Sequence, residues 1–192
     1  MEKGLLGVYI QRLFAMLRLM VFFAFLFSLV FACKSKIKSK PLGKYQNVPL
    51  SESVDSIVIY KAKRQMMVYN QSALLKTYKI FLGPTPIGAK HFEGDGKTPE
   101  GMYHVDGKNP HSLYHKCLGV SYPTDRDRAY ARKAGKPTGG DIKIHGLPNG
   151  KGALSPEFKA VDWTAGCIAL DDQEIDELYL HSEVGVWVNI LP

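Results

Sequence analysis

Short apolar runs separated by stretches rich in Gly and Pro occupy most of the chain after residue 55, and this pattern predicts strands. β-branched and aromatic residues dominate the runs, and these residue types fit the half-buried surface of a sheet. Strands are expected at residues 56–60, 66–69, 74–82, 101–106, 117–122, 141–145 and 186–190. Residues 83–101 contain too many Gly and Pro residues for regular structure, which indicates a long ordered loop.

Residues 171–180 follow a helical period instead, with apolar residues at positions i, i+3 and i+4 that share one face. Asp171 at the start and Glu174 three positions later form a capping-box pair, which predicts where this helix begins. A second, polar and exposed helix is expected within residues 123–140. Together these elements predict a mainly β fold of the α+β class with a few helices.

The amino-terminal region has the composition of an export signal. Residues 19–32 are uncharged and apolar and follow Arg18, but this run is too short for a bilayer span, which needs about 20 residues. The sequence Val-Phe-Ala-Cys that ends at Cys33 resembles a bacterial lipobox, in which the cysteine is lipidated. We therefore expect residues 1–33 to be a signal peptide of the lipoprotein type, with an uncleaved membrane anchor or ordinary secretion as alternatives. All three place the domain beyond the inner membrane, on its periplasmic side.

The basic charge of the chain lies outside the expected domain. The 192 residues carry 25 Lys and Arg against 18 Asp and Glu, a formal net charge of +7. Residues 1–33 contribute +2, and residues 34–50 contribute +5 from five lysines with no acid. The rest holds 17 basic and 17 acidic side chains, so the sequence predicts no basic face and argues against nucleic acid as a partner. Residues 34–54 are then a Lys-rich tether, and residues 55–191 form the folded domain.

One cysteine and one histidine carry the candidate chemistry. Cys167 follows Gly166, a residue type that permits a tight bend and exposes neighbouring amides able to hold a thiolate or an oxyanion. His145 ends an expected strand, and its imidazole is a candidate base for the thiol. Spacing alone leaves two other interpretations open, because a single cysteine is often a small buried side chain and a single histidine is often structural.

The cysteine and the histidine belong to a set of ordered motifs. These are Phe-Leu-Gly-Pro-Thr-Pro-Ile-Gly at 81–88, Ile-His-Gly at 144–146 and Thr-Ala-Gly-Cys-Ile at 164–168. Together they resemble the L,D-transpeptidase catalytic domain of bacterial cell-wall enzymes, over nearly the whole expected domain. Two positions depart from that family: many members have His where this chain has Ala165, and Arg or Asn where it has Ala169.

The resemblance implies a β-sandwich-like fold and a thiol acyltransferase without a cofactor. His145 would take the proton of Cys167, and the thiolate would attack a peptidoglycan stem peptide, release D-alanine and form a thioester. An amine acceptor would then give a 3→3 cross-link, as in a peptidoglycan L,D-transpeptidase, whereas water would give carboxypeptidase or endopeptidase activity. The further site residues expected are Gly166, Gly146 and Thr164 as supporting or oxyanion groups, and Trp163 and Asp162 along the substrate groove. The group that orients His145 stays open among a carbonyl near Gly146, the Thr164 hydroxyl and Asp162.

Two other classes of function need weighing. His111, His115 and Cys117, with His104 nearby, have the side chains of a zinc peptidase, but they share no helical face and no HExxH motif is present. We therefore expect no metal. A disulfide between Cys117 and Cys167 is conceivable after export and would block the nucleophile. The non-enzymatic alternative is a lipoprotein that binds peptidoglycan, which would need no Cys–His pair.

Overall fold

The computed structural model describes residues 49–151, 158 and 160–192. The chain divides into two compact units, Met1–Leu42 and Gly43–Pro192, and the description below concerns the second. The signal peptide expected at 1–33, with Cys33, and most of the expected tether lie outside the described residues. Within the described part of the chain, no helix has the length and apolar character needed to cross a membrane.

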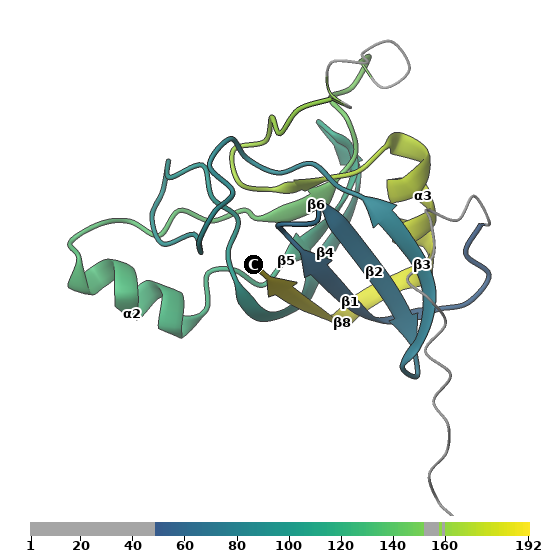
Figure 1. The fold of residues 1–192 in the computed structure, drawn as a ribbon, viewed down its shortest axis with the longest axis horizontal. Helices are drawn as coiled ribbons and strands as arrows, with labels where there is room; N and C mark the ends of the chain where they lie inside the picture. The colour runs from purple at the N-terminus through teal and green to yellow at the C-terminus, as the bar shows by residue number, and fades with distance from the viewer. Residues whose placement is uncertain (1–48, 152–157, 159) are drawn as a thin grey trace, which may run out of the picture. The chain divides into compact units, whose positions relative to one another are not determined.

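The described residues form an eight-stranded sheet with the strand order β3-β2-β1-β8-β4-β5-β6-β7 (Figure 1). Its strands are β1 (Val54–Tyr60), β2 (Gln65–Asn70), β3 (Ala73–Lys79), β4 (Gly101–Ser112), β5 (His115–Val120), β6 (Lys143–His145), β7 (Ile168–Ala169) and β8 (Ser182–Leu191). The β1–β8 and β6–β7 pairs are parallel, and the other neighbouring pairs are antiparallel. The fold is therefore mainly β, as the sequence predicted.

The sheet curls at β4, because this long strand is shared between two partners. Its first residues, Gly101–His104, pair with β8, while the part from Val105 onward pairs with β5. The register shifts just after Val105, and a bulge of this kind increases the local twist. The two ends of the sheet then meet where Phe81, just beyond β3, exchanges two backbone hydrogen bonds of 3.0 and 2.9 Å with Ala169 of β7.

The curled sheet encloses one apolar core. It is built from inward-facing side chains of all the long strands, together with Ile175 and Leu178 of helix α3 (Asp172–His181). Leu50 is 8% exposed and joins this core, as does Val54 at the start of β1. The core thus includes Leu50 and Val54, which precede residue 55, where the sequence predicts that the domain begins.

The two described helices differ in how they pack. Helix α3 lies against the sheet, and the Glu174 side chain accepts a hydrogen bond of 3.2 Å from the Asp171 N–H, as the capping-box pattern predicted (Figure 1). Helix α2 (Asp125–Lys133) projects from the opposite side of the domain and buries only Ala131 (Figure 1). Its polar composition explains this exposure, because it offers the core almost no apolar face.

The sequence located the elements well and misjudged some of their lengths. Strand β4 continues to Ser112 instead of ending at residue 106, because its second half finds a partner in β5. Strand β6 starts at Lys143 instead of residue 141. Strand β7 was not predicted, since its two residues exist as a strand only through pairing with β6.

Candidate active site

Strands β6 and β7 bring the motif residues together. Ile144 pairs with Ile168, and His145 pairs with Ala169, in a short parallel ladder. Lys143 and His145 lie two positions apart on β6 and therefore face the same side of the sheet. Cys167 comes directly before β7, which places it beside the start of β6. The two motifs, 22 residues apart in the sequence, are thus neighbours in the fold.

A single backbone group orients the imidazole of His145. Its Nδ1 lies 2.7 Å from the carbonyl oxygen of Gly146, and because a carbonyl only accepts, Nδ1 carries the proton and donates. In the neutral ring Nε2 is then the unprotonated nitrogen. The side chain is 4% exposed, and this burial lowers the pKa of His145 below its usual 6.5, with the nearby positive charge of Lys143 acting in the same direction.

The Cys167 thiol lies partly exposed at the surface of the site. Its Sγ donates to the carbonyl oxygen of Asp141 at 3.4 Å. Burial raises the pKa of Cys167 above its usual 9.0, while the Lys143 N–H, directed at the sulfur, and the Lys143 charge lower it. The Asp141 carboxylate and the Cys117 thiol add to the increase. Both shifts favour the uncharged forms, a neutral thiol and a neutral imidazole, near neutral pH.

Aromatic rings surround the imidazole. The Tyr114 ring lies 4.7 Å from the His145 ring between centroids, and the Trp163 ring lies 5.7 Å from it in an edge-on arrangement. Tyr114 and Trp163 are 6.0 Å apart, and Phe158 packs on the other side of Trp163 at 5.0 Å. These rings remove water from His145, which is the physical cause of its lowered pKa.

Two side chains hold the segment that leads to the cysteine. The Thr164 hydroxyl donates to the Cys167 carbonyl oxygen at 2.8 Å and accepts from the Gly166 N–H at 3.2 Å. The Asp162 carboxylate receives a two-pronged ion pair from Arg64, with a closest contact of 2.6 Å, and accepts from the Leu82 N–H at 2.9 Å. Both residues thus shape the loop, and neither is bonded to the imidazole. Of the three candidates for orienting His145, the structure selects the Gly146 carbonyl.

Of the residues weighed for a zinc site, His115 binds a carboxylate and Cys117 is buried in the sheet. His115 Nε2 lies 2.8 Å from Asp176 Oδ1, and Cys117 is buried on β5 directly opposite His145. Within the described residues, no group of three or more His, Cys, Asp or Glu side chains is arranged to hold a metal ion. Cys117 and Cys167 are both free thiols, so the disulfide conceivable from the sequence is not formed.

Three contributors to the site carry no clear signal in the sequence. Tyr114 lies in the turn between β4 and β5, and Arg64 lies in the turn between β1 and β2. Asp141 contributes its backbone oxygen, which accepts from the thiol, and the charge of its carboxylate. Asp141 adopts a φ of +56°, a left-handed conformation that Asp tolerates better than most residues. The preceding Gly139-Gly140 pair is typical of a turn, but it does not indicate the contact with Cys167.

Comparison with known proteins agrees with this geometry. Residues 55–190 match the family model of YkuD, the L,D-transpeptidase catalytic domain. The Escherichia coli (strain K12) protein named "Putative L,D-transpeptidase YafK" is 30% identical over 151 residues, which cover 76% of this chain and 54% of the relative. The crystal structure of the helical cell shape determining protein Pgp2 from Campylobacter jejuni matches with a TM-score of 0.53 and 30% identity, over 76% of this chain and 51% of Pgp2.

The curled sheet and the histidine and cysteine motifs on β6 and before β7 thus define the fold and candidate site of an L,D-transpeptidase catalytic domain. This chain belongs to that family. It spans about half the length of the curated relatives it matches.

Proposed function

We propose that this protein is a peptidoglycan L,D-transpeptidase that works through a thioester on Cys167. The observation that carries the proposal is the fixed tautomer of His145. Because Nδ1 is bound to the Gly146 carbonyl, the basic nitrogen is Nε2, which suits a general base for a thiol that directly precedes the neighbouring strand. A structural lipoprotein that only binds peptidoglycan would need neither this tautomer nor a partly exposed thiol.

Acylation begins from the neutral pair. The Cys167 Sγ attacks the carbonyl of the third residue of a stem tetrapeptide, and its proton passes to His145 Nε2. The new S–C bond gives a tetrahedral intermediate. The C–N bond to the terminal D-alanine then breaks, and His145 returns the proton to the leaving amine. The products are free D-alanine and a thioester on Cys167.

The amide groups near the nucleophile have separate roles. The Gly166 N–H donates to the Thr164 hydroxyl oxygen, so its hydrogen bond maintains the loop. The Cys167 N–H is therefore the amide that we assign to the oxyanion, and Gly166 and Thr164 support it. Trp163, which borders His145, and Asp162, which anchors the start of the loop, line the proposed groove for the stem peptide.

Deacylation decides the class of product. An amine of a second stem peptide attacks the thioester, His145 removes its proton, and the released sulfur recovers a proton, which leaves a 3→3 cross-link. The family membership and the relative named for its role in helical cell shape support peptidoglycan as the substrate and cell-wall biogenesis as the process. Residues 1–33 would export the domain, and lipidation at Cys33 would hold it at a membrane on the periplasmic side.

The deciding experiment incubates purified muropeptides with the wild-type protein and with Cys167→Ala. Mass spectrometry separates dimers, expected for the transpeptidase, from tripeptides and from cleaved cross-links. Tripeptides or cleaved cross-links that disappear in Cys167→Ala would still support a thioester on Cys167, with water instead of an amine as its acceptor. Absence of any Cys167-dependent product would overturn the proposal.

A second experiment tests the nucleophile without a natural substrate. A carbapenem carries a strained amide whose carbonyl a thiolate opens, so the wild-type protein should gain the mass of one carbapenem. Cys167→Ala should gain none, while Cys117→Ala should react like the wild type because that thiol is buried. An adduct that persists in Cys167→Ala would contradict the assignment.

The membrane anchor has its own test in cells. Cys33→Ser removes the proposed lipidation site and should move the protein from the membrane fraction to the soluble periplasmic fraction. Retention of the Cys33→Ser variant in membranes would reject lipidation and favour an uncleaved anchor.

A further inference from the structure

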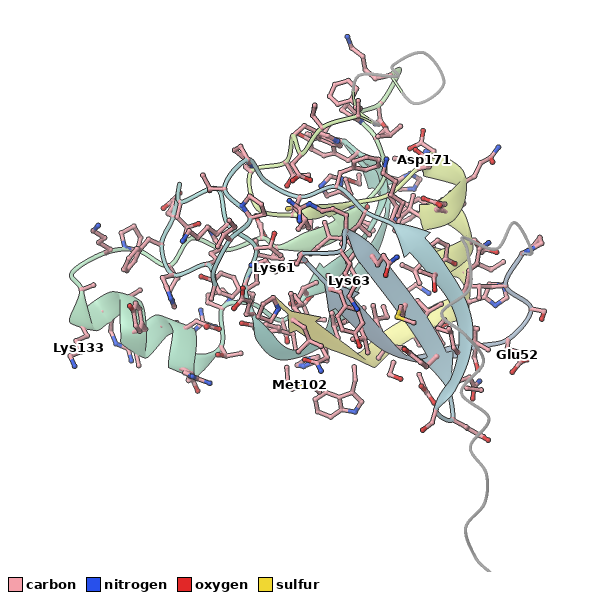
Figure 2. The ribbon with its side chains drawn as sticks, viewed as in Figure 1. Glu52, Lys61, Lys63, Met102, Lys133 and Asp171 are labelled. Atoms are coloured by element: carbon pink, nitrogen blue, oxygen red, sulfur yellow. The ribbon has the colours of Figure 1, made fainter. Side chains whose placement is uncertain are left out.

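A buried lysine lies where the long loop after β3 meets the sheet. Lys61 follows β1 and is only 2% exposed, whereas its neighbour Lys63 is exposed (Figure 2). The Lys61 ammonium donates to three oxygens: the Gly88 carbonyl at 2.7 Å, the Thr98 carbonyl at 3.0 Å and Glu100 Oε1 at 2.8 Å. All three belong to the loop that leads to β4, so one side chain ties the middle of this loop, at Gly88, to its last residues, Thr98 and Glu100.

Thr98 connects this lysine to the segment that carries the nucleophile. Its side chain is fully buried, and its hydroxyl donates to the Gly166 carbonyl oxygen at 2.9 Å. The same residue thus accepts from Lys61 through its own carbonyl and holds Gly166 through its side chain. Gly166 directly precedes Cys167. Two hydrogen bonds therefore connect the Lys61 ammonium to the cysteine loop, one to the Thr98 carbonyl and one from the Thr98 hydroxyl to Gly166.

The loop also packs against the cysteine segment without spare room. Gly166 adopts a φ of +127°, and a Cβ at this position would lie 2.4 Å from the Lys97 carbonyl oxygen. A Cβ at Gly83 would lie 2.2 Å from the Gly96 carbonyl oxygen. Because the two backbones touch, a displacement of residues 96–98 passes directly to Gly166.

Three oxygen acceptors surround the buried amine of Lys61. Burial lowers the pKa of Lys61, and the Glu100 carboxylate opposes that effect. A buried ammonium is stable only when its donors are satisfied, and here three acceptors surround it. Replacement by an apolar side chain would remove the Lys61 donor from Glu100 and from the Gly88 carbonyl, and would leave the Thr98 carbonyl with the Lys90 N–H at 3.2 Å, so the loop would have to rearrange.

We propose that Lys61 is a positioning residue for the nucleophile, acting through Thr98 and Gly166 to fix the loop that presents Cys167. The proposal rests on the proposed function only in taking Cys167 as the reacting group. Lys61 touches neither the thiol nor His145 in the structure, and its effect is transmitted by the loop.

The test compares variants at both links of this path. Lys61→Met removes the ammonium, and Thr98→Val removes the hydroxyl with little change in size, while Thr98→Ser retains the hydroxyl. Lys90→Met is the matched control, because Lys90 is a buried lysine in the same loop that binds Phe92 O and Asp95, both within the loop. Circular dichroism and thermal unfolding establish that each variant is folded at the assay temperature.

Two readouts separate positioning from stability. The first is the rate of carbapenem acylation, which should fall about tenfold or more in Lys61→Met and Thr98→Val and stay near wild type in Thr98→Ser and Lys90→Met. The second is the pH dependence of iodoacetamide alkylation at Cys167, followed by peptide mass spectrometry. A displaced loop moves the sulfur away from the Lys143 N–H, which stabilises the thiolate. The midpoint of the alkylation profile should therefore move to higher pH in Lys61→Met and Thr98→Val only.

The alkylation readout needs no transpeptidase activity, and it therefore decides the inference even when no muropeptide or carbapenem reacts. Unchanged alkylation midpoints in folded Lys61→Met and Thr98→Val would overturn the inference, and so would an equal change in Lys90→Met.

The double variant provides a further criterion. If both residues act along one path, Lys61→Met combined with Thr98→Val should be no slower than the slower single variant, whereas additive losses would reject the path. If Lys61→Met does not fold, the comparison of Thr98→Val with Thr98→Ser decides the outcome.

Discussion

The Nδ1 atom of His145 donates to the carbonyl oxygen of Gly146, the residue that follows it in the chain, at 2.7 Å. Gly146 lies directly after β6, and its position is fixed because its N–H donates to the carbonyl oxygens of Tyr114 at 3.1 Å and Lys116 at 3.2 Å. A backbone carbonyl thus takes the orienting role that a carboxylate has in many catalytic triads. The orientation of the imidazole is accordingly tied to the β4–β5 hairpin.

Gly146→Ala should disturb this arrangement. A Cβ at Gly146 would lie 2.6 Å from Asp172 Oδ1 and 2.9 Å from the His115 Cβ, and both neighbours sit on regular elements. We expect a loss of about 1–3 kcal/mol in the free energy of unfolding and a slower carbapenem acylation. Gly107→Ala is the control, since a Cβ there meets no atom within 4 Å. Equal behaviour of the two variants in urea unfolding and in acylation would contradict the prediction.

The pH dependence of acylation should report a neutral resting pair. The pKa of His145 is lowered from 6.5 and that of Cys167 is raised from 9.0, so neutral imidazole and thiol coexist throughout the interval between these two values. We expect the second-order rate of carbapenem acylation to be flat in that interval and to fall at acidic pH below 6.5, as His145 becomes protonated. Stopped-flow or timed mass measurements between pH 5 and pH 9 would check it. A rate that rises continuously up to pH 9 would indicate that the free thiolate reacts without His145.

The same protonation links folding to pH. Because the folded state binds a proton at His145 less readily than the unfolded chain does, this residue lowers stability as the pH falls below 6.5 and has no such effect above it.

Tyr114→Ala should move the acidic limb of the acylation profile to higher pH. The Tyr114 ring covers His145 at 4.7 Å, and its removal admits water, which relieves the main cause of the lowered pKa. Tyr114→Phe keeps the ring and should retain the wild-type limb. If both variants show the wild-type limb, burial by Tyr114 is not what lowers the pKa.

Asp162→Ala should affect stability more than the apparent affinity for a muropeptide. The carboxylate holds Arg64 and the Leu82 N–H, and loss of these charged hydrogen bonds should cost about 1–3 kcal/mol in urea unfolding. Asp162→Asn keeps an acceptor for Leu82 and should lose less. The contrary result, a raised KM with an unchanged free energy of unfolding, would show that Asp162 acts mainly through the substrate groove and not by holding the loop.

Much of this fold follows from local patterns in the sequence. Apolar, β-branched residues predict β1, and alternation of side-chain character predicts β3, because successive side chains of a strand point to opposite faces. The Asp171 and Glu174 pair predicts the start of α3 through hydrogen bonds that lie within four residues. The residue types of Cys167 and His145, with the glycines beside them, are enough to identify the candidate chemistry, because nucleophile and base are defined by their side chains alone.

The rest required the tertiary structure, because it depends on atoms that are distant in the sequence. The Thr98 hydroxyl meets Gly166 across 68 positions, and Asp162 meets Arg64 across 98. No periodicity records such contacts, since they arise only when the sheet curls at β4 and Phe81 pairs with Ala169. The sequence by itself therefore determined which residues are candidates for the chemistry and where most of the strands lie. Only the tertiary structure decided that the Gly146 carbonyl orients His145 and that a buried Lys61 lies behind the nucleophile loop, because hydrogen bonds and burial are set by three-dimensional proximity.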